Sequence, residues 1–245
     1  MNRRPQPPVD YEGSDLEALS TLRRYQNWIV GTFKPYLKGE TIEFGAGIGN
    51  ISALIRPHVS TLDLVEPSSA LAEPLRGRFK KEAAVRIFSD KLENRLPAIE
   101  AKTYDCVILV NVLEHIEDDE AALEGFLRIL RPGGYLLLFV PALKFLFSDL
   151  DAVHGHFRRY TRPELNARVE GAGFEIIESR YFDTFGILPW WILNTLLGAT
   201  SFQPFLAKVY DTVFAPLSRA LESVITPPIG KNVLLCSRRP EDGSG

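Results

Sequence analysis

Residues 41–50 read TIEFGAGIGN, a short apolar run that ends in three glycines separated by single residues. The run predicts a β-strand, and the glycines predict a tight turn from that strand into a helix. Glycine permits positive φ and lets the backbone approach a ligand closely, while the first turn of the following helix offers unpaired N–H groups. The stretch therefore predicts a ligand site at a strand end, although on this pattern alone a purely structural turn stays open.

The spacing of the glycines separates two kinds of ligand. A dinucleotide fingerprint requires G-x-G-x-x-G with a small sixth residue, but here the third glycine comes one residue early and Asn50 holds the sixth position. Glu43 precedes the turn, and a carboxylate pairs with a cationic group such as the amino group of an amino acid. The pattern therefore favours a ligand with an amino group over a pyrophosphate.

Length and composition indicate one globular α/β domain. The chain has 245 residues, 45% hydrophobic and 24% charged, with a formal net charge of −3; this suits a single core and gives no reason to expect a nucleic-acid partner. Cys106 and Cys236 lie in apolar runs and offer no zinc set, so we expect no metal site and a reducing, cytoplasmic location. No secretory signal is apparent. Residues 1–13 and 239–245 are expected to lack fixed structure, and 14–238 to form the domain.

Two further strands are predicted to end in acidic residues on the same edge. Residues 61–65 form an apolar strand that runs into Glu66, which follows Gly45 by 21 residues. At this spacing a carboxylate binds ribose hydroxyls in a Rossmann-like unit. Residues 85–88 form the next strand and lead to Asp90, whose carboxylate suits the exocyclic amine of an adenine. The aligned strand ends together indicate a nucleoside pocket.

The fourth strand is followed by polar residues at the same edge. Residues 104–110 are almost all apolar, which predicts a buried parallel strand, and Asn111 and Glu114 come soon after it. The four acids at 117–120 predict a solvated helix start that the helix dipole favours. The sequence RPGG at 131–134 predicts a turn before the fifth strand.

Together these motifs resemble those of the class I S-adenosylmethionine-dependent methyltransferases, over about residues 38–141. The resemblance implies a Rossmann-like three-layer α/β sandwich with a seven-stranded, mostly parallel sheet whose last strand, here 232–237, is antiparallel. It also implies S-adenosylmethionine as the cofactor, with Glu43 and the glycines holding the methionyl part, Glu66 the ribose and Asp90 the adenine.

The expected cofactor-binding residues lie at these strand ends, with one addition. A helix predicted at 14–34 leads into the first strand, and Tyr25 on it is kept as a candidate ligand residue. The full set is Tyr25, Glu43, Gly45, Ala46, Gly47, Glu66, Pro67, Ser89, Asp90, Lys91, Asn111, Val112, Glu114 and His115.

The loop at 147–161 carries the candidate catalytic residues His154, His156 and Tyr160. Similar His-x-Arg-Arg-Tyr-Thr stretches border the acceptor pocket in small-molecule methyltransferases of this class. An O–H or N–H acceptor gains from a base of near-neutral pKa, which histidine provides; the alternative is a histidine that only ties the loop down. The two arginines before Tyr160 are expected to bind an acidic acceptor or to pair with an aspartate of the loop.

An apolar insertion at about 184–231 separates the sixth strand, at 174–182, from the last. Residues 184–207 carry no charge, but Pro189 and Gly198 are among the residues that interrupt them, so we expect no integral membrane span. A helical lid over an apolar acceptor, a homodimer contact and a peripheral membrane-surface patch through 184–207 all stay open.

The function expected from these features is transfer of a methyl group from S-adenosylmethionine to an oxygen or nitrogen of a small or lipid-like acceptor. An NAD-dependent oxidoreductase is the main enzymatic rival, and Asn50 with the early third glycine disfavours it. A non-enzymatic protein that binds S-adenosylmethionine or its product is the other rival, against which the histidine-bearing loop argues.

Overall fold

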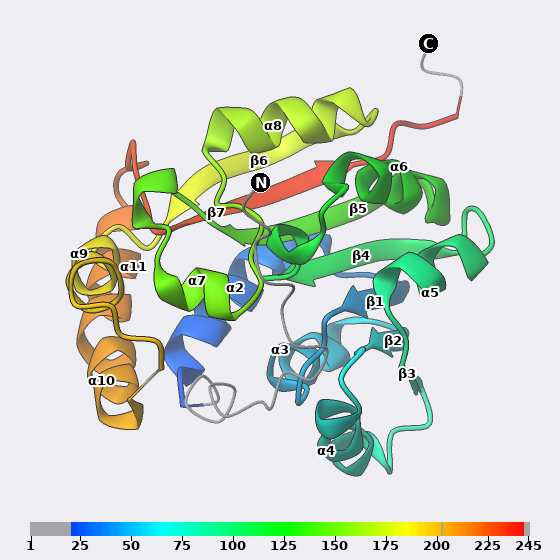
Figure 1. Cartoon of the computed structure of the whole chain (residues 1–245). Helices are drawn as coiled ribbons and strands as arrows, with labels where there is room; N and C mark the ends of the chain where they lie inside the picture. The colour runs from blue at the N-terminus through cyan, green and yellow to red at the C-terminus, as the bar shows by residue number, and fades with distance from the viewer. Residues whose placement is uncertain (1–20, 202, 243–245) are drawn as a thin grey trace, which may run out of the picture.

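A computed structural model describes residues 21–201 and 203–242 and contains a seven-stranded sheet (Figure 1). The strand order is β3-β2-β1-β4-β5-β7-β6; β1 to β5 pair in parallel, and β7 is antiparallel to both neighbours. The predicted sheet is therefore confirmed. The strands are β1 (Glu40–Phe44), β2 (Thr61–Val65), β3 (Val85–Phe88), β4 (Tyr104–Val110), β5 (Leu130–Pro141), β6 (Glu175–Phe182) and β7 (Asn232–Arg238).

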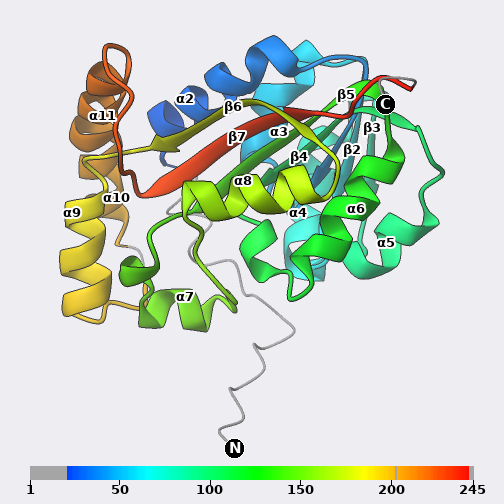
Figure 2. The same cartoon turned by 90° about the horizontal axis from the view of Figure 1, so that it is seen from above.

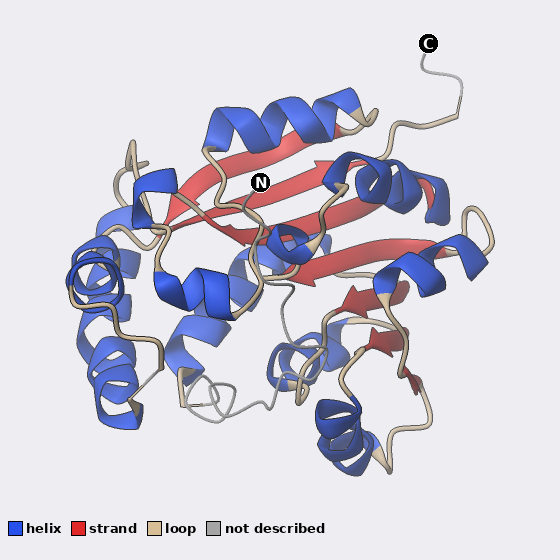
Figure 3. Cartoon of the chain, in the orientation of Figure 1, coloured by secondary structure: helices blue, strands red, loops and turns tan. Residues whose placement is uncertain are grey.

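Helices cover both faces of this sheet and make the three-layer sandwich (Figures 2 and 3). Helices α2 to α4 pack on one face, and α5, α6 and α8 on the other. Part of the helix predicted at 14–34 is α2, whereas residues 14–20 and the N-terminal segment 1–13 lie outside the described residues. The α-helices are α2 (Arg23–Phe33), α3 (Asn50–Ile55), α4 (Ser69–Phe79), α5 (Leu92–Ala98), α6 (Asp119–Ile129), α7 (Asp149–Val153), α8 (Arg162–Gly171), α9 (Ile187–Trp190), α10 (Pro204–Val209) and α11 (Ala215–Glu222).

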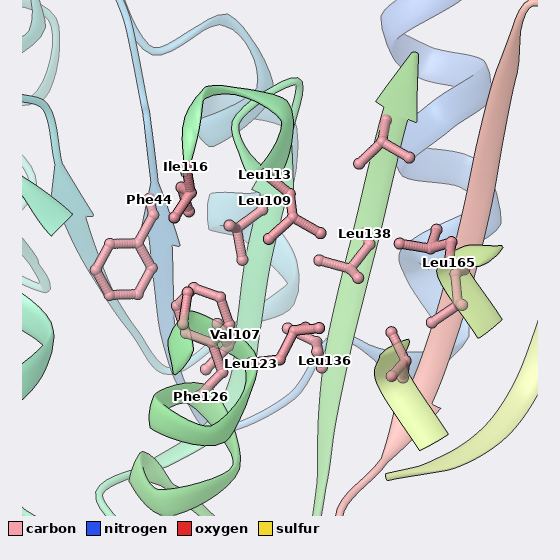
Figure 4. Packing of buried hydrophobic residues seen from close by; sticks show 14 of the residues in the cluster. Phe44, Val107, Leu109, Leu113, Ile116, Leu123, Phe126, Leu136, Leu138 and Leu165 are labelled. Atoms are coloured by element: carbon pink, nitrogen blue, oxygen red, sulfur yellow. The ribbon is translucent and has the colours of Figure 1, made fainter. Parts of the chain in front are cut away.

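The central strand β4 is buried on both sides, as its nearly continuous apolar sequence predicts. Val107 and Leu109 face the side of α6, where they pack near Phe44 and Phe126 (Figure 4). Cys106, with its buried thiol, faces the opposite side and joins the core beneath α2 to α4. Because side chains alternate along a strand, β4 contributes residues to the hydrophobic cores on both faces of the sheet.

The chain between β6 and β7 folds into helices at one edge of the sheet, drawn in yellow and orange in Figure 1. Both ends of this insertion meet at the buried Asp183. Its carboxylate accepts hydrogen bonds from Tyr210 and, at 3.0 Å, from Ser218, and it pairs with Lys231 Nζ at 3.1 Å. The Lys231 N–H also donates to the Asp183 carbonyl at 3.1 Å. Among the described residues no helix is both long and apolar enough to cross a membrane.

The structure corrects two expectations, one for residues 131–134 and one for the segment that follows β7. The turn predicted at 131–134 is instead the irregular beginning of β5, where Gly133 has a φ of 70°. Its neighbour strand continues there as well: the Gly133 N–H donates to the Arg239 carbonyl at 3.0 Å, and the Arg239 N–H to the Gly134 carbonyl at 2.8 Å. The Arg239 guanidinium also donates to the Leu130 carbonyl at 2.8 Å. The tail at 239–245 therefore starts anchored, and 243–245 lie outside the described residues.

Candidate functional site

The glycine turn after β1 is shaped by backbone conformation and by close packing. Gly45, Gly47 and Gly49 have φ of 72°, 56° and 81°, which L side chains rarely adopt. A Cβ on Gly45 would lie 2.3 Å from the side chain of Val112, and one on Gly49 would lie 2.7 Å from Leu75 in α4. The early third glycine therefore serves helix packing, while the first lets the turn approach the end of β4.

Two carboxyl groups lie at the adjoining ends of β1 and β2. Glu43 is only 2% exposed and accepts a hydrogen bond from Ser52 Oγ at 2.5 Å. Burial raises the pKa of Glu43 to about 8, against the opposing effect of the Ser52 hydrogen bond. Glu66 accepts from the N–H groups of Gly47 at 2.8 Å and Ser68 at 2.9 Å, and burial raises its pKa. The glycine turn and the end of β2 are thus joined by the hydrogen bond from Gly47 to Glu66, and we call this connected set of strand ends the wall.

The end of β3 continues this wall. The Glu66 N–H donates to the Phe88 carbonyl at 3.0 Å, so the ends of β2 and β3 are in register. Asp90 accepts from the N–H of Lys91 at 2.9 Å, and Ser89 accepts from the side chain of Arg76. Pro67 leads from the end of β2 into α4. The strand-end residues that we expected are therefore neighbours along one edge of the sheet.

Tyr25 lies apart from this wall, among aromatic rings at the base of the insertion. It is buried, its ring packs edge to face against Phe139, Phe182 and Tyr210, and its hydroxyl donates to Asn232 Oδ1 at 3.0 Å. Its role in cofactor binding stays a prediction, since these contacts by themselves give it a packing role.

After β4 the chain turns sharply and places the carboxyl group of Glu114 in a buried position. Asn111 is exposed, has a φ of 53° and donates its N–H to the Phe139 carbonyl at 2.8 Å. Glu114, in the short 3-10 segment η3 (Leu113–His115), is 0% exposed, and neither of its carboxyl oxygens has a hydrogen-bond partner among the described residues. Burial raises its pKa to about 8. His115 follows it at the surface.

The loop after β5 folds back onto this segment. The Phe157 N–H donates to the Glu114 carbonyl at 2.9 Å. His156 Nδ1 lies 2.8 Å from Asp151 Oδ1, and its ring packs edge to face against that of His115 with centroids 4.5 Å apart. The ring of His154 lies 6.1 Å from that of His156. His154 and His156 therefore gather with Glu114 and His115 at the end of β4, although about 40 residues separate the two pairs in sequence.

Buried partners hold His156 in place. Arg159 is 3% exposed and contacts Asp151 through Nε at 3.0 Å and Nη2 at 2.9 Å. Ser148 donates to the second oxygen of Asp151 through its N–H and hydroxyl, each at 2.9 Å. The arginine and histidine contacts lower the pKa of Asp151 to about 2 in spite of its burial. Arg159 thus pairs with a loop aspartate, one of the two outcomes expected for the loop arginines.

Tyr160 is placed differently from the other two candidate catalytic residues. It is 1% exposed and its hydroxyl donates to Asp119 Oδ2 at 2.7 Å; burial and this hydrogen bond raise its pKa. Asp119 also pairs with Arg158 and Arg168, each at 2.7 Å. Tyr160 therefore joins the loop to the start of α6, and its side chain is almost completely buried.

The sequence reasoning missed the partners of these residues. Asp119 was expected to be a solvated helix-start acid, yet it is buried with Tyr160 and the two arginines. Asp151, which orients His156, was expected only as a possible arginine partner. The spacing of Ser148 and Asp151 is that of a capping box, and this signal indicates a short helix that holds the aspartate fixed.

Comparison with known proteins identifies the family. Residues 22–179 match the family model described as a methyltransferase domain. An S-adenosyl-L-methionine-dependent Diels-Alderase from Talaromyces variabilis is 27% identical over 124 residues, which cover 48% of this chain and 41% of that protein. The chain matches less than half the length of each of the curated relatives found.

Solved structures share the fold at low sequence identity. A chain from the Haloferax volcanii complex of the Trm112 methyltransferase activator with a methyltransferase has a TM-score of 0.64 and 14% identity, covering 94% of this chain and 97% of that one. An S-adenosylmethionine-dependent methyltransferase from Mesorhizobium loti has a TM-score of 0.61 and 14% identity, with coverage of 87% and 98%. The family model covers more than half of the chain and the solved structures share its fold, so this chain belongs to the methyltransferase domain family.

Proposed function

We propose that the protein methylates an oxygen or nitrogen of a small or lipid-like acceptor at the edge formed by the ends of β1 to β4. The observation that carries this proposal is the loop that folds back onto η3. In this loop Asp151 Oδ1 lies 2.8 Å from His156 Nδ1 and orients the imidazole ring. A base that is already oriented suits an acceptor whose heteroatom must lose a proton. Acceptor chemistry then lies beside the loop at the end of β4, and the cofactor binds along the strand ends from β1 to β4.

The strand-end residues fit the cofactor. The glycines leave backbone uncovered by Cβ atoms, Glu43 suits the amino group of the methionyl part, and Glu66 and Asp90 suit the ribose hydroxyls and the adenine amine. We assign the neighbouring positions to the same site: Ala46, Pro67, Ser89, Lys91, Asn111, Val112 and His115. When bound, S-adenosylmethionine supplies an electrophilic methyl group, so the protein's own contribution is to position the acceptor and take up its proton.

The proton acceptor is His154 or His156. A hydrogen bond from His156 Nδ1–H to Asp151 leaves a lone pair on Nε2. Burial lowers the pKa of His156 even though Asp151 opposes this effect, so the ring is neutral near pH 7. Tyr160 supports the same site as a positioning residue, through its hydrogen bond to Asp119.

The insertion supports an acceptor with an apolar part. Trp190 Nε1 donates to the Leu146 carbonyl at 3.1 Å, and the Trp190 ring lies over Arg159 at 4.6 Å, so the insertion adjoins the histidine loop. Its exposed large apolar side chains are Phe185, Leu188, Trp191, Ile192, Leu196, Leu197, Phe205, Leu206, Val213, Leu217, Val224, Ile225 and Ile229. Within its described residues the exposed charges are Lys208 and Arg219, both cationic. This composition suits contact with a lipid surface, and a homodimer contact is the competing use of the same face.

Product formation tests the proposal. Methyl-labelled S-adenosylmethionine is incubated with the protein and with either an aqueous metabolite pool or a lipid extract, and labelled product and S-adenosylhomocysteine are both measured. We expect equal amounts of the two, with turnover reduced in His154→Ala or His156→Ala. Full activity of both variants would refute a histidine base. Tight cofactor binding with no S-adenosylhomocysteine formed would instead favour a use of the cofactor without methyl transfer, as with a sensor or a cyclase like the Diels-Alderase relative.

A further inference from the structure

Glu114, His115 and His156 form a cluster whose potential metal-binding atoms all lie within 4.8 Å of one another. We propose that this cluster binds one divalent transition-metal ion, with Zn²⁺ or Co²⁺ chemistry, which holds the heteroatom of the methyl acceptor. The binding site is independent of the proposed function, whereas its role in catalysis rests on it. No sequence motif predicts this metal site, because two of the ligands are adjacent and the third lies 41 residues further on.

The state of the Glu114 carboxyl group is the first support. It is 0% exposed, and neither oxygen has a hydrogen-bond partner among the residues that the structure describes. A buried polar group without a partner is costly. The nearby guanidinium of Arg159 contributes its charge, but its donors are directed at Asp151 and at the Ala142 carbonyl. A cation beside Glu114 would satisfy both oxygens.

The orientation of His156 is the second support. Asp151 lies 2.8 Å from Nδ1, while Nε2 points toward Glu114 Oε1, 4.0 Å away. A carboxylate behind a histidine is the usual outer contact of a metal-binding imidazole, since it fixes the ring and the tautomer. Asp151 is itself fixed by Ser148 and Arg159. The loop therefore presents one nitrogen lone pair to the buried carboxyl group.

His115 completes the set on the solvent side. Its ring packs edge to face against His156, and the residue is exposed. In a tetrahedral site, ligand bonds of about 2.1 Å place donor atoms about 3.4 Å apart, so side-chain movements of about an ångström would close the cluster. Three protein ligands leave coordination positions open, as in catalytic metal sites. Two imidazoles and one carboxylate favour zinc-like ions over Mg²⁺, which prefers oxygen ligands.

A metal ion at this cluster would give His156 and His154 different roles. His156 Nε2 cannot bind a metal ion and take up a proton at once, so the proton-accepting role in the proposed function goes to His154. The metal would polarise the O–H or N–H of a bound acceptor and make its proton easier to remove. The proton would then pass to the imidazole of His154. The electron pair of the heteroatom would form the new bond to the methyl carbon, while the bond from that carbon to the sulfonium sulfur breaks and its electron pair stays on the sulfur of S-adenosylhomocysteine.

Co²⁺ binding tests the site without any need for activity. Tag-free protein is stripped with EDTA, titrated with Co²⁺ and followed by visible absorption, with competition by Zn²⁺ and by Mg²⁺. We expect one Co²⁺ per chain, displaced by Zn²⁺ and not by equal Mg²⁺. Binding should weaken about 100-fold in Glu114→Gln and in His156→Ala, and about 10-fold in Asp151→Asn. His58→Ala, a change of an exposed histidine on another element, should bind as the unchanged protein does.

The outcomes separate the two proposals. Stoichiometric Co²⁺ binding that is lost in these variants supports the site even if no methyl transfer is found. Absence of binding, or binding that the variants retain, overturns it, and methyl transfer by metal-stripped protein would then leave the proposed function standing. If Glu114→Gln fails to fold, as judged by circular dichroism and S-adenosylhomocysteine binding, the exposed His115→Ala variant decides the question.

Discussion

Glu43 is expected to make binding of the methyl donor strongly dependent on pH. Burial raises its pKa to about 8 from an ordinary value of 4.5, and only the ionised carboxylate attracts an ammonium group. With this pKa about 1% of the group is ionised at pH 6 and about half at pH 8. Affinity for S-adenosylhomocysteine should therefore rise about 50-fold over this range, or about 2.3 kcal/mol.

Calorimetric titration with S-adenosylhomocysteine at pH 6, 7 and 8 measures this effect. Glu43→Gln keeps an acceptor for Ser52 but removes the titration, so its affinity should be low and nearly constant. Glu73→Gln, which changes an exposed carboxylate in α4, should retain the slope. A flat profile for the unchanged protein, or an undiminished slope in Glu43→Gln, would refute the placing of the amino group at Glu43.

The same pKa predicts a stability effect of opposite sign in the free protein. Because the folded state raises the pKa of Glu43, the folded protein binds the proton more tightly than the unfolded chain between about pH 4.5 and 8. The contribution to stability is full below that window and is lost as the pH rises through it. Glu43→Gln should consequently unfold at a higher temperature than the unchanged protein at pH 8 to 9, as measured by circular dichroism.

Three further predictions follow from packing and exposure. Gly49→Ala adds a Cβ at a φ of 81° within 2.8 Å of two side chains of α4; it should lower the free energy of unfolding by about 1–3 kcal/mol, as urea titration would detect. Tyr160→Phe removes one buried hydrogen bond and should destabilise the protein by about 1 kcal/mol while methyl transfer persists; loss of turnover in a folded variant would restore a catalytic role. Leu197→Glu changes a side chain of the insertion that is 72% exposed, and it should weaken co-sedimentation with anionic lipid vesicles about tenfold. The control Ile177→Glu, on edge strand β6, should not weaken it. Unchanged vesicle binding together with loss of a dimer would show that the exposed apolar face of the insertion serves self-association.

The sheet could be predicted because its signals are local. Continuous apolar runs such as 104–110 mark buried parallel strands, and each glycine or acid at a strand end marks the binding edge. The alignment of Glu66 and Asp90 with the glycine turn needed only the rule that parallel strands end on one edge. The turn expected at 131–134 was wrong because pairing with the segment at Arg239 extends the strand, and nothing near the glycines in sequence signals that partner.

For the loop after β5, where we propose that the acceptor binds, the sequence predicted the candidate residues but not their partners. The loop was recognised by its histidines, but the meeting of His156 with Glu114 and of Tyr160 with Asp119 depends on a chain that returns from the end of β5 to the end of β4. Such contacts are set by tertiary packing, which no local pattern reports. The helix-start acid Asp119 was expected to be solvated, yet it is buried in the structure, and the complete burial of Glu114 was not predicted either.

The pairing of Asp183 with Lys231 brings the two ends of the insertion together at the sheet. Asp183, which precedes the insertion, and Lys231, its last residue, are joined through the ion pair and through the backbone hydrogen bond from Lys231, both at 3.1 Å. The register of β6 and β7 therefore does not depend on how many residues lie between them, and doubling a loop's length costs only about 0.6 kcal/mol in closure entropy. A change in the length of the insertion can therefore leave the pairing of β6 with β7 intact.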